Sequence, residues 1–399
     1  MGYRFAILGA GRQGVAAAYD LARFGSAARI RFLDRELPRA RAAAARINRL
    51  LRRRVASAVR VDAGDGRAVA SAIQGCNAVL SAASYRLNVQ VTRAAIQACV
   101  PLCDLGGNTG IVQAQRKLNA QACKAGVAIM PDCGLAPGLG NVLAVYALER
   151  LAARGVQATA IHIYCGGLPL RRLPPLGYKL LFNMEGLINE YLGYADYLRN
   201  GRLAKVETLS ELETLDFPAP VGRCEAFVTS GGLSRLPLQL RGRLRVLEYK
   251  TVRYPGHCEK IRTLRDLGLL DERPIDVRGK QVVPQELFAA AAAPHLDFPR
   301  EPDLVVLRVV ALGESRSGRS RGARLQLDLL DRSDPRTGFT AMERTTGFPT
   351  AIVALGLARG ELAPGVRTPE AAVNPGVFVR ELARRGLRVR ERWERKHVR

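Results

Sequence analysis

The chain has 399 residues, of which 61 are Lys or Arg and 36 are Asp or Glu, so its formal net charge is +25. A hydrophobic fraction of 48% is ordinary for a folded chain, which excludes intrinsic disorder and fibrous structure. No apolar run approaches the roughly 18 residues needed to span a bilayer. We therefore expect a soluble protein of two or three domains.

The excess of basic residues has two interpretations. It is compatible with a nucleic-acid or acidic-membrane partner. However, Arg is scattered over the whole length, with local clusters at 52–54, at 316–324 and in the tail from 384. Aromatic residues make up only 6% of the chain, and no nucleic-acid-binding motif is visible. We expect no specific nucleic acid and no membrane partner, and leave open the roles of the Arg-rich loop 316–324 and the tail.

The cysteines point to a reducing compartment. The chain has eight of them, with no Cys-x-x-Cys pair and no spacing typical of metal ligands. A chain of this size has no need of disulfides for stability. The sequence therefore predicts reduced, mostly buried thiols in a cytoplasmic protein, and no metal site.

The first part of the chain alternates short β-like runs with helical stretches. Helices are predicted from Arg12 to Gly25 and, in an Arg-rich and Ala-rich stretch, up to about Arg54. Regular alternation implies a parallel sheet with helices on both faces. Six strands in this order indicate a doubly wound Rossmann domain over residues 1–131. The strands are predicted over 4–8, 29–33, 59–61, 78–82, 102–105 and 127–130.

After Pro131 the pattern changes, and strands cluster without strict helix alternation. This arrangement is typical of an α+β fold, so the chain is predicted to be α/β with a second, α+β substrate and dimerisation domain over residues 132–345. Residues 346–399 comprise a predicted helix over 348–359 and a basic, partly helical tail. This helix is a candidate to pack back on the first domain. In the second domain, residues 134–138 are predicted to form a turn that starts a helix ending at about 154. Strands are predicted over 160–165, 226–229, 244–251, 304–312 and 324–330, and further helices over 186–198, 257–267 and 285–293.

A glycine motif, Gly-Ala-Gly-Arg-Gln-Gly, directly follows the first strand and opens a helix. In this context it predicts a dinucleotide site. Gly9 permits a tight turn, Gly11 lets the backbone approach a pyrophosphate, and Gly14 allows close contact between strand and helix. The helix N-terminus, which begins with Arg12 and Gln13, offers N–H groups and a positive dipole to the phosphates.

An acidic residue at the end of the second strand favours NAD over NADP. Asp34 lies 20 residues beyond Gly14, where its carboxylate would accept hydrogen bonds from the ribose hydroxyls and repel a 2′-phosphate. Arg35 opposes this reading, because its guanidinium could pair with that phosphate or stack on adenine.

Three further residues follow strand ends. Asp62 is placed to contact adenine or, equally well, to cap the next helix. Ser84 and Tyr85 follow the fourth strand, at the usual edge of a nicotinamide pocket, although packing within the loop explains them as well. A nucleotide-responsive binding protein would carry the same features, but an intact glycine motif beside a large second domain favours a dehydrogenase.

Five separated segments, spread over nearly the whole chain, resemble the saccharopine dehydrogenase-like family. Within it they are most similar to the lysine 6-dehydrogenase branch. The resemblance implies NAD-dependent oxidative deamination of the L-lysine ε-amino group to 2-aminoadipate 6-semialdehyde and ammonia, by a homo-oligomer. The segments are DLGGN (104–108), PDCGLAPG (131–138), EAFVTSGGL (225–233), EYKTVRYPGH (248–257) and RTTGFP (344–349).

Two departures separate the chain from the saccharopine-forming branch. Ala136 stands where that branch has Asp, and residues 229–232 (TSGG) replace an Asn-Arg-Asp-Ser run that helps hold the extra carboxylates of saccharopine. Serine cannot replace the bidentate contact of an arginine. We expect a smaller, less acidic substrate, with another amine or imine, such as saccharopine or a carboxylated polyamine, as the alternative.

Oxidation of an amine needs a base that deprotonates the ammonium. A carboxylate to hold the amine, a His or Tyr for proton transfer and an Arg for the α-carboxylate would suffice for an amino-acid substrate. Asp104, at the end of the fifth strand, is either catalytic or a cap of the loop at Gly106 and Gly107. Arg253 either binds the α-carboxylate or forms a surface salt bridge. His257 is either catalytic or simply the first residue of a helix.

The resemblance adds further candidates. Asn183 corresponds to a family position near cofactor and substrate, and Tyr178 corresponds to a nearby aromatic residue that is a further catalytic candidate. Thr251, Ser230 and Gly106 lie in segments that resemble the family's substrate-contacting parts. Leu180 to Met184 departs from the common Ser-Trp-Ser-Pro pattern.

Overall fold

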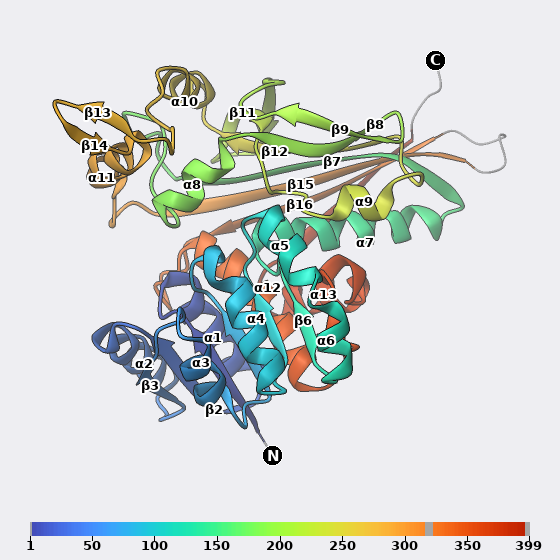
Figure 1. Cartoon of the computed structure of the whole chain (residues 1–399). Helices are drawn as coiled ribbons and strands as arrows, with labels where there is room; N and C mark the ends of the chain where they lie inside the picture. Colours follow the sequence, from blue (N-terminus) through green and yellow to red (C-terminus); the bar gives the residue numbers. More distant parts are fainter. Residues whose placement is uncertain (1, 316–321, 396–399) are drawn as a thin grey trace.

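The computed structural model describes residues 2–315 and 322–395 and arranges them in two layers, each built on one sheet (Figure 1). Within these residues the first sheet has seven parallel strands, in the order β17-β6-β5-β4-β1-β2-β3. The first six in chain order follow the doubly wound arrangement, so the predicted Rossmann fold is confirmed. The strands are β1 (Tyr3–Leu8), β2 (Ala27–Asp34), β3 (Ala56–Arg60), β4 (Ala78–Ser81), β5 (Leu102–Asp104), β6 (Ala128–Met130) and β17 (Gly365–Val366).

The inner strands of the first sheet, β1, β4, β5 and β6, are buried on both faces and are largely apolar, whereas β2 and β3 toward one edge are partly exposed. Phe5 and Ile7 point toward the core that includes α1 and α2, whereas Ala6 and Leu8 point toward α3 and α4 on the other face. This is the two-residue alternation of a pleated strand. The helices are α1 (Arg12–Phe24), α2 (Leu37–Leu51), α3 (Gly66–Ile73), α4 (Asn88–Gln97), α5 (Thr109–Arg116) and α6 (Asn119–Lys124).

The second sheet is mixed, as expected for an α+β domain. Its main path runs β10-β11-β12-β7-β15-β16-β18, with β8 and β9 attached beside β12. β12 is parallel to β7, and the other pairs are antiparallel. The strands are β7 (Val156–Pro169), β8 (Tyr194–Arg199), β9 (Arg202–Glu207), β10 (Glu213–Phe217), β11 (Gly222–Val228), β12 (Val246–Arg253), β15 (Asp303–Ser315), β16 (Ala323–Arg332) and β18 (Val389–Arg395).

The helices of this half lie mainly between the sheets or at one end of the second sheet (Figure 1). They are α7 (Gly140–Ala152), α8 (Met184–Glu190), α9 (Leu236–Leu240), α10 (His257–Asp266) and α11 (Pro284–Leu296). A small hairpin, β13 (Ile275–Val277) and β14 (Lys280–Val282), links α10 to α11.

The last part of the chain connects the two layers. Helix α12 (Ala341–Ala358) packs on α1, where Gly347 is required because a Cβ there would lie 2.8 Å from the backbone nitrogen of Ala17. Thr340 and Glu343 cap this helix with a capping box, so it begins seven residues before the predicted start at 348. β17 then joins the first sheet, and helix α13 (Pro375–Arg384) follows.

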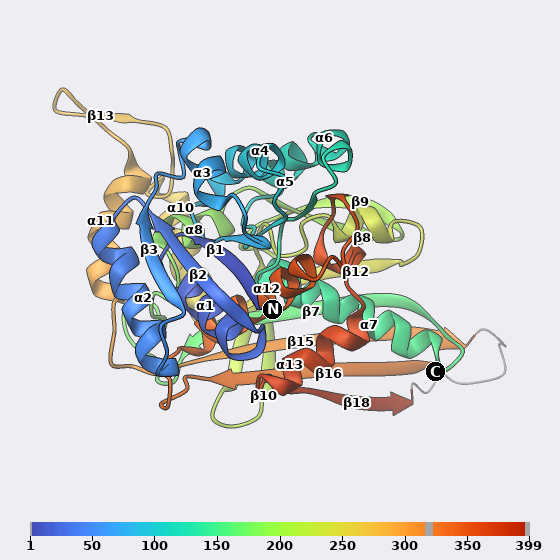
Figure 2. The ribbon, with the colours of Figure 1, turned by 90° about the horizontal axis from the view of Figure 1, so that it is seen from below.

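Two predicted elements differ from the structure. The helix expected over 186–198 ends at Glu190, because Gly193 adopts a left-handed φ of +77° and residues 194–199 pair with β9 as a strand. The tail is helical in α13 as expected, but residues 389–395 form β18, which lies beside β16 at the edge of the second sheet (Figure 2).

In the part of the chain that the structure describes, no helix is long and apolar enough to cross a membrane. Six of the eight cysteines are buried, whereas Cys99 and Cys123 are exposed. Residues 316–321 of the Arg-rich loop and the last four residues of the tail lie outside the described residues.

Candidate active site

The glycine loop between β1 and α1 needs glycine for two different reasons. Gly9 has a φ of +94°, and a Cβ there would lie 2.7 Å from the carbonyl oxygen of Ala82. At Gly14 a Cβ would lie 2.3 Å from the Gly9 oxygen. At Gly11, in contrast, a Cβ would meet none of the described atoms within 4 Å. Gly11 therefore leaves open space at a helix N-terminus, which fits a bound phosphate group.

Asp34 is anchored to this loop. Its Oδ2 accepts a hydrogen bond of 2.8 Å from the backbone N–H of Ala10, and its Oδ1 accepts one of 3.0 Å from Glu36. Each carboxylate oxygen keeps a second lone pair for a ligand hydroxyl. The neighbouring Arg35 is largely exposed and lies 3.9 Å from Glu36.

These residues line a cavity of about 300 Å³, which we call the edge cavity. Asp62 also faces it and accepts a hydrogen bond of 2.8 Å from the N–H of Gly64. The residue that caps α3 is Asp65 and not Asp62. The other expectation for Asp62, a contact with adenine, stays a prediction. The edge cavity is lined by residues that include Gly9, Gly11, Asp34, Arg35, Arg39, Asp62 and Ser84.

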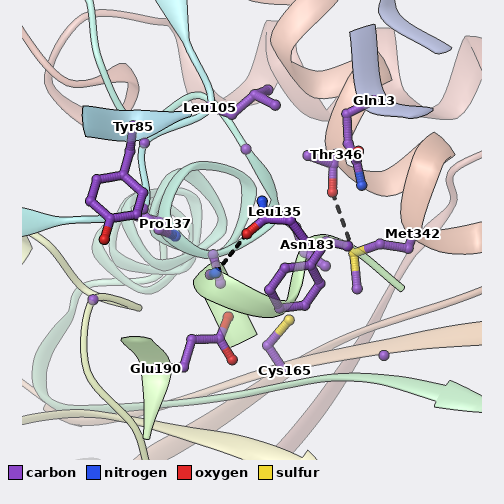
Figure 3. Close-up of a pocket in the computed structure, with 18 of the residues that line it drawn as sticks. Gln13, Tyr85, Leu105, Leu135, Pro137, Cys165, Asn183, Glu190, Met342 and Thr346 are labelled. Carbon is purple, nitrogen blue, oxygen red and sulfur yellow. Dashed lines mark hydrogen bonds between the residues drawn. The ribbon is translucent and has the colours of Figure 1, made fainter. Parts of the chain in front are cut away.

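A second cavity, of about 210 Å³, lies between the two layers, and we call it the central cavity (Figure 3). It shares Ala82, Ala83 and Ser84 with the edge cavity. The two cavities thus form one path from Asp34, past the glycine loop, to the space between the domains. An extended dinucleotide has this shape, with its adenosine end at the sheet edge.

Eight residues predicted from the sequence line the central cavity. Thr251 and Arg253 are two apart on β12 and so share a face of the sheet. Asn183 caps α8, since its Oδ1 accepts a 2.6 Å hydrogen bond from the N–H of Gly186. The eight are Gln13, Ser84, Tyr85, Gly106, Asn183, Ser230, Thr251 and Arg253.

Arg12 lies outside both cavities in the structure. Its guanidinium donates a 3.2 Å hydrogen bond to the carbonyl oxygen of Leu180, which belongs to the second domain. Arg12 therefore bridges the two layers next to the loop predicted to hold the phosphates.

Asp104 is fully buried and does not line the central cavity. Its Oδ1 accepts hydrogen bonds from the N–H groups of Gly106 (2.8 Å) and Asp132 (3.3 Å), and its Oδ2 accepts one of 2.7 Å from the Gln115 amide. Burial raises the pKa of this carboxyl, which its hydrogen bonds partly offset. The structure thus places Asp104 away from the cavity and in contact with the loop after β5, with backbone amides on its Oδ1 and the Gln115 side-chain amide on its Oδ2.

His257 and Tyr178 lie behind the cavity wall rather than on it. Burial lowers the pKa of His257 to about 3, so the ring is neutral. Its Nδ1 donates to the Leu176 carbonyl (3.0 Å), and its Nε2 accepts from the Tyr191 hydroxyl (2.9 Å). The ring of Tyr178 lies 4.9 Å from the guanidinium carbon of Arg253, within the range of a cation–π contact. The structure thus places both predicted catalytic residues behind the wall of the cavity, where Tyr178 contacts Arg253.

The residue that sequence analysis missed is Glu190, at the end of α8. Figure 3 shows its carboxylate pointing into the central cavity. Its Oε2 lies 3.7 Å from Nη2 of Arg253. Burial raises the pKa of Glu190 to about 7, although the positive charge of Arg253 lowers it in part. A carboxylate of this pKa can exchange protons near neutral pH.

A signal for Glu190 was present in the sequence. Asn183, Gly186 and Glu190 are spaced by three and four residues, which places them on one face of a helix. All three line the central cavity. Extending that spacing from Asn183 would have pointed to Glu190.

The charge of the central cavity is nearly balanced. Among the described residues that line it, Glu190 and Arg253 are the charged ones, and they face each other. No group of three or more His, Cys, Asp or Glu side chains placed to hold a metal ion occurs in residues 2–315 and 322–395. The arrangement offers one proton acceptor, one fixed cation and several neutral polar groups.

Comparisons with known proteins agree with the two halves of the fold. The family model described as the saccharopine dehydrogenase NADP binding domain matches residues 5–130, and the saccharopine dehydrogenase C-terminal domain matches residues 134–387. The solved structure of apo saccharopine dehydrogenase (L-Glu forming) from Saccharomyces cerevisiae superposes with a TM-score of 0.78 at 20% identity, covering 98% of this chain and 100% of that one.

Curated relatives share part of the sequence. The saccharopine dehydrogenase [NADP(+), L-glutamate-forming] of Schizosaccharomyces pombe is 28% identical over 54% of this chain and 48% of its own length. The S. cerevisiae enzyme of the same name is 25% identical over 56% and 51%. The mitochondrial alpha-aminoadipic semialdehyde synthase of Rattus norvegicus is 25% identical over 73% of this chain and 38% of its own. The chain spans about half, or less, of the length of these relatives.

Proposed function

The chain belongs to the saccharopine dehydrogenase family, and we propose that it catalyses the NAD-dependent oxidative deamination of the L-lysine ε-amino group. The products are 2-aminoadipate 6-semialdehyde, ammonia and NADH. The observation that carries this proposal is the position of Glu190, a carboxylate with a pKa near neutrality that faces the end of the dinucleotide path.

The residues of the first domain fit a dinucleotide. The open space at Gly11 suits the pyrophosphate, Asp34 suits the adenosine ribose, and Ser84 and Gln13 line the path to the central cavity. NAD supplies the hydride acceptor when it is bound. A carboxylate at the end of β2 disfavours a 2′-phosphate, which supports NAD, whereas Arg35 and Arg39 on the same cavity favour NADP.

Glu190 is the proposed base. An ammonium cannot release hydride from its carbon, so it must first lose a proton, and ionised Glu190 accepts that proton. The neutral amine then loses hydride from the ε-carbon to give an iminium. Water adds to the iminium carbon, and ammonia leaves as the aldehyde forms. Glu190 must first release the ammonium proton to solvent. Its carboxylate can then take the proton of that water, which a pKa of about 7 permits near neutral pH.

The balance of charge supports a substrate less acidic than saccharopine. Saccharopine carries three carboxylates, and the central cavity presents Arg253 with its charge already opposed by Glu190. Ser230 and Gly231, at the positions of the missing Arg-containing run, also line this cavity and add no charge. Each extra carboxylate of saccharopine would lose its hydration on entering the site, and no cationic side chain of the cavity would offset that free-energy cost.

The direct test is formation of NADH by the purified protein with NAD and L-lysine, L-ornithine, saccharopine or polyamines, repeated with NADP. We expect turnover of lysine, with one ammonia released for each NADH formed. Turnover of another amine would keep the reaction class and discard the substrate. No turnover with any amine would overturn the proposal and favour a nucleotide-responsive binding protein.

The acidic limb of the pH profile tests the role of Arg253. Arg253→Gln should move the acidic limb of kcat/KM for lysine to higher pH, because the guanidinium no longer lowers the pKa of Glu190. Arg253→Lys, which keeps the charge, should move it much less. A higher KM for lysine with an unmoved acidic limb would instead favour the α-carboxylate contact expected from the sequence.

A further inference from the structure

We infer that a third cavity, beside the central one, binds the α-amino and α-carboxylate groups of the amino-acid substrate through Asp196 and Lys205. This inference rests on the proposed function, since it assigns a place to the end of lysine that does not react. It goes beyond that function by naming a second subsite and the chemical class of its ligand, a zwitterionic amino-acid head group.

The third cavity, which we call the side cavity, has a volume of about 320 Å³. It is lined by the start of α5 in the first domain and by β8 and β9 in the second. Its walls are mostly polar. They include Asn108, Gln113, Asn189, Asp196, Lys205 and Thr229.

The side cavity adjoins the central cavity. Ser230, Gly231 and Tyr249 line both of them. Gly231 has a φ of +83°, and a Cβ there would meet only the Gly107 oxygen, at 4.0 Å, among the described atoms. The hydroxyl of Ser230 donates to the backbone oxygen of Asn189 at 2.8 Å, so its hydrogen-bonding direction is already set. The junction is thus bordered by small residues and by one aromatic ring, which suits a chain of methylene groups.

The charges of lysine explain why a second subsite is needed. Four methylene groups separate the ε-amine from a head group that carries one positive and one negative charge. Glu190 and Arg253 lie only 3.7 Å apart, so they form one charged position in the central cavity. If Glu190 receives the reacting amine, the head group needs a cation and an anion elsewhere.

Asp196 and Lys205 provide both charges. Their Oδ1 and Nζ atoms lie 3.0 Å apart across the β8–β9 pair. The pair is partly exposed, with 38% and 70% of the side chains accessible, and the Lys205 ammonium has two further N–H groups for a ligand. An α-ammonium beside Asp196 and an α-carboxylate beside Lys205 would then give each of the four charged groups a neighbour of opposite charge. Exposed ion pairs are weak by themselves, so the cost of opening this one is small.

The test combines two variants with two truncated substrates. Cadaverine lacks the carboxylate of lysine, and 6-aminohexanoate lacks its α-amine. Lys205→Gln should reduce the preference for lysine over cadaverine about tenfold and leave kcat/KM for cadaverine unchanged. Asp196→Asn should reduce the preference for lysine over 6-aminohexanoate by a similar factor. Matched controls are Asp276→Asn and Lys280→Gln on the exposed β13–β14 hairpin, which should change neither preference.

The outcomes separate this inference from the proposed function. If the protein oxidises lysine but neither variant changes its preference for lysine over the truncated substrates, the proposed subsite is wrong and the proposed reaction stands. Equal losses for lysine and both truncated substrates would also overturn it, since they would show a structural effect. Failure of the wild-type protein to oxidise any of the three amines would instead contradict the proposed function.

Discussion

Glu190→Gln is expected to lower kcat for lysine by about 10²–10⁴-fold, because the amide keeps the shape of the side chain but cannot accept the proton of the ammonium. The affinity for NAD should stay unchanged, since Glu190 lies on the wall contributed by the second domain. Steady-state kinetics together with NAD titration by fluorescence would measure both quantities.

The matched control is Glu185→Gln. Glu185 lies on the same helix, does not line the central cavity, and forms an ion pair with Arg86 at the surface. Its replacement should change kcat only slightly. Similar losses in the two variants, or a Glu190→Gln enzyme of nearly full activity, would remove Glu190 from the mechanism. In the wild-type enzyme, kcat/KM should fall as the pH drops below about 7, where Glu190 takes up its proton.

Arg385→Met is expected to destabilise the folded chain by about 3–5 kcal/mol. The guanidinium of Arg385 donates to both oxygens of Asp20, at 2.7 and 2.9 Å, and both side chains are completely buried. Removing Arg385 leaves the Asp20 carboxylate buried without its partner. Urea denaturation followed by circular dichroism would measure the loss.

Arg384→Met provides the control for this second prediction. Arg384 is the neighbouring residue, is 60% exposed and pairs with Glu381 on the surface. Its loss should cost no more than about 1 kcal/mol. The double variant Asp20→Leu/Arg385→Met should recover much of the stability, because it removes both charges of the fully buried pair, while Glu381, which also binds Arg385, is partly exposed and keeps its pair with Arg384. Equal effects of Arg384→Met and Arg385→Met would contradict a structural role for the buried pair.

The Rossmann half was predictable because its signals are local. A parallel strand buried on both faces must be continuously apolar, and each helix between strands has its own boundaries. The glycine motif also specifies backbone geometry directly, as the φ of Gly9 and the crowding at Gly14 show. The family resemblance seen in five separated segments is confirmed by the models that match both halves of the chain.

The second domain was less predictable, because its strands are defined by distant partners. Residues 194–199 follow a helix after only three residues, and their strand conformation depends on pairing with β9 and β12. Similarly, residues 389–395 are mostly charged, with Val389 and Trp393 as the apolar residues, and they form a strand because β16 offers a free edge. Periodicity within a short segment carries little information about such pairing.

Residue type and position at strand ends predicted part of the lining of the edge cavity, including Gly11 and Asp34. The family resemblance predicted Thr251 and Arg253, which line the central cavity. These features follow from the chain alone, because strand ends and alternating faces are set by neighbouring residues. Whether a titratable group reaches the cavity depends instead on burial by distant elements. Packing enclosed Asp104 and His257 among hydrogen-bond partners and left Glu190 facing the space between the layers. Burial and neighbouring charges in the folded state then set the pKa of each of these groups, which is why the sequence could not single out Glu190.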